Sequence, residues 1–409
     1  MGRMDTPTLL APLQLPGGRT LRNRIVMPPL VIWRSDESAE VNDAHVNHYR
    51  DTVPGCGLVV VEATTVSPEG RLASTQLGIF EDRHIAGLTR LARTIRDAGA
   101  LPGIQIHHAG GRSDTVKTWG AVPLAPSPVP GKSEIRELTE DDIRRIIADF
   151  ATAAERAVQA GFGLLEIHGA HGYLGSQFLS PRTNRRTDRW GGSLENRQRF
   201  LVEVTRAVRE AVSGRALVSC RLGVAEGPPR GGGSTREPEP GLTVKEGIAT
   251  ARTLVAAGLQ MIHVSHAGSI PEPIESPPTD KESPAHSVTP DATSADPPQD
   301  STIPPQPVFA PDPVLQLARP VKAAVTVPVI GVSGVLTATH AEQALLGGYG
   351  DLIAAGRAML ADPGWARKVA DGKGAKIERC VQCRPRCFHF TDPVKCPARK
   401  RLGIGPPGG

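Results

Sequence analysis

The sequence lacks long apolar runs and a strong charge imbalance. In its 409 residues, no apolar stretch approaches the ~20 residues that a helix needs to span a bilayer. The net charge is only +5, and no basic helix or series of aromatic and basic residues marks a nucleic-acid binder. The opening Met-Gly-Arg-Met-Asp-Thr-Pro does not have the apolar core of a signal peptide. These absences predict a cytoplasmic protein that binds neither membranes nor nucleic acids.

Glycine, proline and apolar residues are plentiful. The 44 Gly and 38 Pro require many loops, and a hydrophobic content of 39% is enough to build a core. Of the six Cys, Cys56 and Cys220 lie within apolar runs and are expected to be buried thiols, whereas the other four crowd near the carboxyl end. This use of cysteine suits a reducing compartment. The mildly basic balance, with a pI of about 9.0, also suits anionic cofactors and substrates.

Short apolar runs alternate with amphipathic segments along most of the chain. Buried strands are predicted at 25–27, 58–62, 103–108, 164–167, 216–222, 261–265, 329–332 and 351–354. Helices are predicted at 84–98, 139–160, 194–212, 244–257, 313–325 and 338–346. This alternation indicates an α/β fold, a (β/α)₈ TIM barrel. A doubly wound sheet would have about five or six strands and a glycine-rich turn after the first strand, and the sequence has no such turn.

Two stretches interrupt the alternation. Residues 226–241 are rich in Gly, Pro, Arg and Glu, and residues 269–311 are rich in Pro, Ser, Thr and Asp. Both follow strands, so we expect both at the catalytic rim of the barrel. Disorder is the expectation for residues 271–305, with a lid over the substrate as the alternative. The sequence thus predicts a barrel over residues 1–375 and a Cys-rich tail over residues 376–409.

A cluster of polar side chains follows the fourth predicted strand. His168, His171 and Tyr173 emerge from the loop after it, and Gly169 and Gly172 allow the backbone to turn sharply between them. Two imidazoles and a phenol at the carboxyl end of a barrel strand can bind a developing oxyanion and deliver a proton. The spacing alone leaves a second interpretation open, in which the two His satisfy each other under a loop.

Longer motifs resemble the Old Yellow Enzyme family of FMN-dependent oxidoreductases. They are Leu21-Arg-Asn-Arg-Ile-Val-Met27, Glu62-Ala-Thr-Thr-Val-Ser-Pro-Glu-Gly-Arg71, Gln105-Ile-His-His-Ala-Gly110, His168-Gly-Ala-His-Gly-Tyr173 and Asn184-Arg-Arg-Thr-Asp-Arg-Trp-Gly-Gly-Ser-Leu-Glu-Asn-Arg197. Two further segments, Val329-Ile-Gly-Val-Ser-Gly334 and Ala355-Gly-Arg357, resemble the phosphate-binding end of that family. The resemblance covers residues 8–375 apart from the two interrupting stretches.

The resemblance implies a (β/α)₈ barrel with FMN at its mouth. The residues implied to bind FMN are Pro28, Pro29, Ala63, Gln105, Arg221, Gly334, Gly356 and Arg357. The first three should line the flavin ring, and Gln105 should hydrogen-bond its pyrimidine edge. Arg221 should lie near N1 and O2 of the ring, where a fixed guanidinium favours the negative charge of the reduced flavin. The last three should hold the phosphate, at the loops after strands seven and eight.

The activity implied by the resemblance is reduction, by NAD(P)H, of the activated C=C bond of an α,β-unsaturated carbonyl compound. His168 and His171 should hydrogen-bond the carbonyl oxygen of this small-molecule substrate. Tyr173 should protonate the α carbon, because a phenol with a reference pKa of ~10 holds its proton at neutral pH. The alternatives are an amine or N-methyl dehydrogenase on the same flavin, and a non-enzymatic redox-sensing barrel. A homo-oligomer is compatible with the sequence.

The tail contains a cysteine motif. Cys380-Val-Gln-Cys-Arg-Pro-Arg-Cys-Phe-His-Phe-Thr-Asp-Pro-Val-Lys-Cys396 has the spacing C-x₂-C-x₃-C-x₈-C. It resembles the [4Fe–4S] segment of the 2,4-dienoyl-CoA reductase and trimethylamine dehydrogenase branch, although the last gap is shorter here. The four thiolates, Cys380, Cys383, Cys387 and Cys396, suit an iron–sulfur cluster or zinc, and free thiols are the third alternative.

Overall fold

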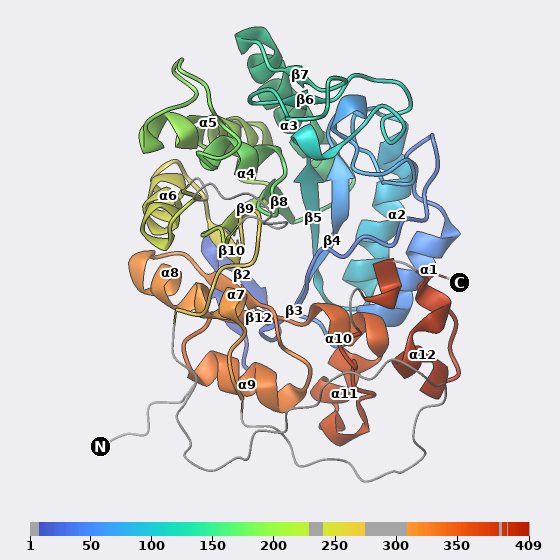
Figure 1. The fold of residues 1–409 in the computed structure, drawn as a ribbon. Helices are drawn as coiled ribbons and strands as arrows, with labels where there is room; N and C mark the ends of the chain where they lie inside the picture. The colour runs from blue at the N-terminus through green and yellow to red at the C-terminus, as the bar shows by residue number, and fades with distance from the viewer. Residues whose placement is uncertain (1–7, 229–239, 275–308, 384–386, 391, 409) are drawn as a thin grey trace, which may run out of the picture.

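Eight parallel strands close into a barrel at the centre of the molecule (Figure 1). The computed structural model describes residues 8–228, 240–274, 309–383, 387–390 and 392–408. Most of the two interrupting stretches, including residues 275–305 of the segment predicted to be disordered, lies outside these ranges. The barrel strands follow one another in chain order: β3 (Ile25–Met27), β4 (Leu58–Thr65), β5 (Leu101–His107), β8 (Leu164–Gly169), β9 (Leu217–Gly223), β10 (Met261–Ser265), β11 (Val329–Val332) and β12 (Leu352–Ala354). The predicted TIM barrel is therefore confirmed.

Helices surround the barrel (Figure 1). In chain order they are α1 (Asp43–Thr52), α2 (His84–Asp97), α3 (Glu140–Gln159), α4 (Leu174–Leu179), α5 (Leu194–Val212), α6 (Val244–Ala256), α7 (Pro313–Gln316), α8 (Ala318–Ala324), α9 (Ala338–Leu346), α10 (Gly356–Ala361), α11 (Trp365–Ala370) and α12 (Pro397–Arg401). One difference from the predicted elements is that the segment at 313–325 forms two helices. Pro320 explains the break, because its ring nitrogen has no hydrogen to donate to the Gln316 carbonyl one turn earlier.

Side chains of the barrel strands alternate between the inside and the outside. On β8, Leu164 belongs to an apolar cluster made only of strand residues and their neighbours inside the barrel, whereas Leu165 and Ile167 pack with helix residues outside it. Glu166 and His168 therefore point inward with Leu164, because side chains two apart share a face of a strand. Toward the carboxyl end of β8, the inward-facing positions thus change from apolar to polar.

The same order occurs on three adjacent strands. The inward-facing series are Gly103, Gln105 and His107 on β5, Leu217, Ser219 and Arg221 on β9, and Met261, His263 and Ser265 on β10. The opposite end of the barrel is apolar. There, the antiparallel hairpin of β1 (Leu13–Leu15) and β2 (Arg19–Leu21) contributes Leu15 and Leu21 to the inner cluster. The polar residues are consequently confined to one mouth of the barrel.

The carboxyl-terminal segment is attached to the barrel near α1 and α10 (Figure 1). Its described part contains 3₁₀ helices at Phe388–Phe390 and Pro393–Lys395 before α12. His389 Nε2 is 2.8 Å from the carbonyl oxygen of Val31, in the loop after β3. Arg399 Nη1 donates to the carbonyl oxygen of Leu360, in α10, at 2.9 Å. The remaining two-stranded sheet, β6 (Leu124–Ala125) with β7 (Arg136–Glu137), precedes α3. Within the described ranges, no helix has both the length and the apolar character required to cross a membrane.

Replacing the N-cap of α3 provides a test of the local stability of the fold. The Thr139 hydroxyl accepts from Asp142 N at 3.2 Å, and the Asp142 carboxylate accepts from Thr139 N at 2.8 Å. Thr139→Ala removes one half of this capping box, so we expect the free energy of unfolding to fall by about 1 kcal/mol. Thr89→Ala, at an exposed position within α2, is the matched control and should change it by less than about 0.5 kcal/mol. Urea unfolding followed by circular dichroism measures both, and equal midpoints would contradict the capping role.

Candidate active site

The polar ends of β5, β8, β9 and β10 meet at one mouth of the barrel. Strand pairing places Gln105 beside Glu166, His168 beside Arg221 and Arg221 beside His263. Because parallel strands in a barrel end at the same rim, these inward-facing groups form one continuous polar layer.

Glu166 is the fully buried centre of this layer. Its Oε1 accepts from Gln105 Nε2 and its Oε2 lies against His263 Nδ1, each at 2.8 Å. Burial lowers the pKa of His263, and the opposing effect of Glu166 does not reverse the shift. His263 is therefore neutral and donates its Nδ1 proton to the carboxylate. Both side-chain oxygens of Glu166 thus have a partner, as buried polar groups require.

Three imidazoles and a hydroxyl form a chain across the mouth. His107 Nδ1 is 2.8 Å from His168 Nδ1, and His168 Nε2 is 3.0 Å from His171 Nδ1. His171 Nε2 is in turn 2.7 Å from Ser265 Oγ. The two predicted catalytic His are thus in contact with each other, and each also has a second partner from another strand.

All three imidazoles of this chain are neutral at physiological pH. Burial, followed by the neighbouring His108, lowers the pKa of His107 to about 3. Burial also holds the pKa of His168 well below its usual range, with His107 as the next contribution. For His171 the pKa is held well below the usual range by burial and then by the charge of Arg221. Each ring therefore carries one proton, so each N···N contact has one donor and one acceptor.

Tyr173 packs edge-on against these imidazoles. Its ring centroid is 4.7 Å from that of His107 and 4.9 Å from that of His168. The guanidinium of Arg112 lies over the ring, 5.6 Å from the centroid. Burial raises the pKa of Tyr173, and the positive charges of Arg112 and Arg221 oppose this only in part. The phenol consequently keeps its proton at neutral pH and is available as an acid.

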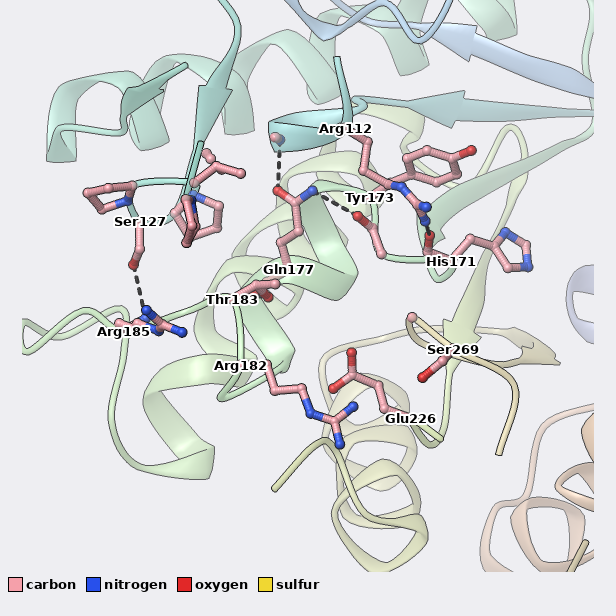
Figure 2. A pocket seen from close by; sticks show the side chains of 18 of the residues that line it. Arg112, Ser127, His171, Tyr173, Gln177, Arg182, Thr183, Arg185, Glu226 and Ser269 are labelled. Carbon is pink, nitrogen blue, oxygen red and sulfur yellow. Dashed lines mark hydrogen bonds between the residues drawn. The ribbon is translucent and has the colours of Figure 1, made fainter. Parts of the chain in front are cut away.

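A cavity of about 920 Å³ opens beside Tyr173 and His171 (Figure 2). Gln177 connects the loops that form one wall, since its Oε1 accepts from Gly111 N at 3.0 Å and its Nε2 donates to the carbonyl oxygen of Gly172 at 2.8 Å. Residues at the described ends of both interrupting stretches, Glu226 and Ser269, also line the cavity. Both stretches therefore start at the catalytic rim, as expected from the sequence.

A second cavity of about 170 Å³ adjoins the first, and His171 lines both. Five of the eight residues that the family resemblance assigned to FMN line it, namely Pro28, Arg221, Gly334, Gly356 and Arg357. Among the described residues, Arg221 Nε is buried with no hydrogen-bond partner. Gly334 has φ +71°, and an added Cβ would lie 2.9 Å from Cβ of Asp312, so the backbone there requires glycine. Arg221 and Arg357 thus give the wall of this cavity a positive charge, and Arg221 Nε offers it a hydrogen-bond donor.

The other three of these residues lie beyond the lining of this second cavity. Pro29 is buried after β3, and Ala63 is buried in β4, where its carbonyl oxygen accepts from Gln76 Nε2 at 2.8 Å. Gln105 uses its amide hydrogen to bond Glu166. The assignment of all eight residues to a cofactor stays a prediction.

The four tail cysteines line one small enclosed cavity together with Arg357. Burial raises the pKa of Cys380 and of Cys387. In the part of the chain that the structure describes, no three His, Cys, Asp or Glu side chains are close enough to hold a single metal ion. Arg357 also lines the second cavity, so the cysteine cavity and the second cavity share a wall.

Sequence reasoning gave no role to several groups that the fold brings to this site. His107 and Ser265 were recognised only as parts of a motif and of a strand, although each is the last residue of its strand. Arg112 ends a 3₁₀ helix, Gly110–Arg112, and Gln177 lies in the short helix α4; the sequence predicted neither helix. The positions of His107 and Ser265 at the ends of their strands could have identified them, because a polar residue that ends a buried barrel strand faces the mouth.

Glu62 is a buried acid at the same rim. Its Oε2 accepts from the backbone N of Ile32, in the loop after β3, at 3.1 Å. Within the described structure, its Oε1 has no hydrogen-bond partner. Burial raises the pKa of Glu62 to about 8, with the bond from Ile32 opposing the shift. The carboxyl group is therefore protonated at neutral pH.

Comparisons with known proteins agree with one another. The model of the NADH:flavin oxidoreductase / NADH oxidase family matches residues 8–375. The chain is similar to an NADH oxidase of Thermoanaerobacter brockii, with 36% identity over 377 residues, 91% of this chain and 52% of that protein. It is similar to an NADPH dehydrogenase of Geobacillus sp. (strain WCH70), with 36% identity over 370 residues, 89% of this chain and 94% of that protein.

A solved structure extends the comparison. The fold is similar to that of 2-naphthoyl-CoA reductase in complex with 2-naphthoyl-CoA, with a TM-score of 0.76 and 27% identity over 94% of this chain and 55% of that one. The chain thus spans about half the length of this enzyme and of the NADH oxidase, and nearly all of the NADPH dehydrogenase.

The protonated state of Glu62 predicts how stability depends on pH. The folded pKa of about 8 lies above the unfolded value of 4.5, so the unfolded chain releases its proton first. Between pH 4.5 and 8 the free energy of unfolding should therefore fall, by at most about 1.4 kcal/mol for each pH unit. Glu62→Gln keeps an oxygen for Ile32 N and cannot ionise. The free energy of unfolding of the variant, relative to that of the wild type, should therefore increase as pH rises. Urea midpoints at pH 5 and pH 8 measure this, and parallel pH curves would exclude it.

Proposed function

This chain belongs to the NADH:flavin oxidoreductase / NADH oxidase family, the Old Yellow Enzyme family that its motifs resemble, and we propose that it reduces the activated C=C bond of α,β-unsaturated carbonyl compounds with NAD(P)H. It is an oxidoreductase of the NAD(P)H:flavin type. The observation that carries the proposal is the contact of Tyr173 with the His168–His171 pair where two cavities adjoin. A proton donor and a carbonyl-binding pair thus lie beside room for two ligands.

The second cavity suits FMN. The buried Nε of Arg221 offers a donor and a fixed positive charge to the flavin ring, and Gly334, Gly356 and Arg357 offer backbone and cationic groups to a phosphate. Pro28, which lines the same cavity, would contact the ring, with Pro29, Ala63 and Gln105 as further ring contacts on the family pattern. FMN, when bound, supplies the hydride that NAD(P)H donates and that the β carbon of the alkene receives.

His168 and His171 hold the carbonyl oxygen of the substrate. Their facing nitrogens, Nε2 of His168 and Nδ1 of His171, lie 3.0 Å apart and are neutral. Hydrogen bonds from neutral imidazoles draw electron density from the double bond and stabilise the negative charge that develops on the oxygen. The interpretation in which the two His only satisfy each other describes the site without a substrate.

Tyr173 delivers the proton to the α carbon. Its raised pKa keeps the phenol protonated, and the edge contacts with His107 and His168 fix the direction of the ring. Arg112 lies over the ring and donates to the carbonyl oxygen of His171, so groups from separate elements contact Tyr173. An acid held in this way transfers its proton with little reorganisation.

The larger cavity has room for a substrate bigger than a simple enone. Arg112, Arg182 and Arg185 are among its lining residues, with Glu226 as an acidic neighbour (Figure 2). An anionic group on the substrate suits this lining. Because 2-naphthoyl-CoA reductase is similar in fold, an α,β-unsaturated acyl-CoA belongs beside a plain enone in the first substrate tests.

The tail holds a [4Fe–4S] cluster in this proposal. The four cysteines surround one cavity but, among the described side chains, no three are close enough for a single ion. The resemblance of the motif C-x₂-C-x₃-C-x₈-C to a [4Fe–4S] segment is what favours the cluster over zinc. All six cysteines are free thiols, which favours a reducing, cytoplasmic setting.

Tyr173→Phe tests the proton-donor role. The rate of alkene reduction by the reduced enzyme should fall by roughly 10²-fold or more, whereas flavin reduction by NAD(P)H should stay within about threefold. Tyr349→Phe, which removes a phenol in the turn between α9 and β12, is the matched control. Stopped-flow absorbance of each half-reaction makes the measurement. Equal slowing of both half-reactions would contradict the role, and turnover of an N-methylated amine without turnover of any enone would replace the proposed activity.

Cys383→Ser tests the cluster. The wild type, purified without oxygen, should contain about four iron atoms and four labile sulfides per chain, and the variant should lose most of both. Its flavin content should not change. Cys56→Ala, at a buried thiol outside the tail, is the control and should keep its iron. About one zinc per chain, or wild-type protein without iron after reconstitution, would refute the cluster.

A further inference from the structure

Two residues flank the His168–His171 pair, and the inference about them rests on the proposed function. His107, at the end of β5, contacts the outer nitrogen of His168, and Ser265, at the end of β10, contacts the outer nitrogen of His171. The two inner nitrogens, which face each other at 3.0 Å, are the ones available to a carbonyl oxygen. The hydrogen bond that the outer nitrogen of each ring makes therefore decides whether the inner nitrogen of the same ring carries a hydrogen.

This dependence follows from the single proton of a neutral imidazole. If the outer nitrogen accepts a hydrogen bond, the proton must be on the inner nitrogen, and the ring can donate to a substrate. If the outer nitrogen donates, the inner one is a bare lone pair and repels the carbonyl oxygen. Two inner N–H groups are needed to stabilise an enolate oxygen from both sides.

His107 fixes the first ring. Its Nε2 is buried and, within the described residues, has no hydrogen-bond partner. A buried N–H without a partner is rarer in proteins than a buried acceptor without one. The proton of His107 is therefore on Nδ1, from which it is donated to Nδ1 of His168. His168 must then carry its own proton on the inner Nε2.

Ser265 fixes the second ring when a substrate is present. A hydroxyl can either donate or accept, because its hydrogen rotates. Without a substrate, His171 accepts from His168 at Nδ1 and donates from Nε2 to Ser265. When the carbonyl oxygen of a substrate approaches both inner nitrogens, the other tautomer of His171 becomes favourable. Ser265 then donates to Nε2 of His171, and His171 carries its proton on Nδ1. Ser265 can support both states without moving, and its position on the wall of the second cavity keeps it beside His171.

We propose that His107 and Ser265 are positioning residues that set the tautomers of His168 and His171, so that both rings present an N–H to the carbonyl oxygen of the substrate. His107 has no exposed surface, whereas His168 keeps an exposed fraction of 5%, so His107 acts only through His168. Ser265 acts through His171. Without a substrate, the two imidazoles hydrogen-bond each other. His107 and Ser265 together allow both rings to donate an N–H to the developing oxyanion instead.

The test compares two replacements of His107. Asn places an amide N–H close to the position of Nδ1 and can still donate to His168, whereas Leu fills similar space without a donor. His48→Leu makes the same replacement at another buried histidine, under the carboxyl-terminal segment, and is the control for general loss of stability. Ser265→Ala removes the hydroxyl at the other end of the chain.

The first readout is the binding of 4-cyanophenol, whose phenolate oxygen is a stable analogue of an enolate oxygen. His107→Leu and Ser265→Ala should each weaken its binding to the flavin-loaded protein by about 10- to 100-fold. His107→Asn should bind within about threefold of the wild type, and His48→Leu likewise. In enone reduction, kcat should fall more than KM rises for His107→Leu, because the charge on the oxygen is larger in the transition state.

The second readout is the ¹⁵N resonance of the ring nitrogens in protein labelled at histidine. With 4-cyanophenol bound to the wild type, His168 should be protonated at Nε2 and His171 at Nδ1. In His107→Leu, His168 should populate both tautomers. This measurement is independent of turnover, so it tests the inference even if the enzyme reduces no enone.

Two results would overturn the inference. One is His107→Leu binding the phenol as tightly as His107→Asn, which would reduce His107 to a packing residue. The other is a bound-state spectrum in which either inner nitrogen lacks a proton. A wild type that binds the phenol with both inner nitrogens protonated, yet reduces no enone, would instead contradict the proposed function alone.

Discussion

A strand in a closed barrel sends only every second side chain inward, and this constraint decides where the chemistry of the molecule lies. On β8 the inward series runs from Leu164 through Glu166 to His168, and β5, β9 and β10 repeat the change from nonpolar to polar. The apolar part is sealed at the bottom by the β1–β2 hairpin. Strand pairing then aligns the polar ends, so that residues far apart in sequence meet at one rim without any loop having to bring them there.

The polar layer is stable because its members satisfy one another. Glu166 is bonded from two strands, and the imidazoles bond in series, so that almost every buried donor has an acceptor. A buried network of this kind is rigid, since breaking one bond leaves two groups without partners. Within the described residues, Arg221 Nε stays without a partner, and Arg221 lines the second cavity. This N–H is therefore available to a ligand, whereas the bonded groups hold the site together.

The elements of the barrel could be predicted from the sequence because each is encoded locally. Apolar runs gave the eight strands, and spacing and capping residues such as Thr139 gave most helices. The break at Pro320 was missed, although proline is a local signal. The two outer bonds of the chain from His107 to Ser265 could not be predicted in the same way, because they join residues 61 and 94 positions apart. Such contacts depend on strand register and side-chain direction, which single-sequence patterns do not specify.

The placement of the two interrupting stretches has a consequence for how this protein can diverge. Both begin at residues that line the larger cavity, Glu226 and Ser269. Lengthening such a loop is inexpensive for folding, at about 0.6 kcal/mol for each doubling. Insertions and deletions there can therefore be inherited with little penalty, while they change what an incoming molecule meets first. Folding thus constrains the barrel more tightly than it constrains the length of the two interrupting stretches.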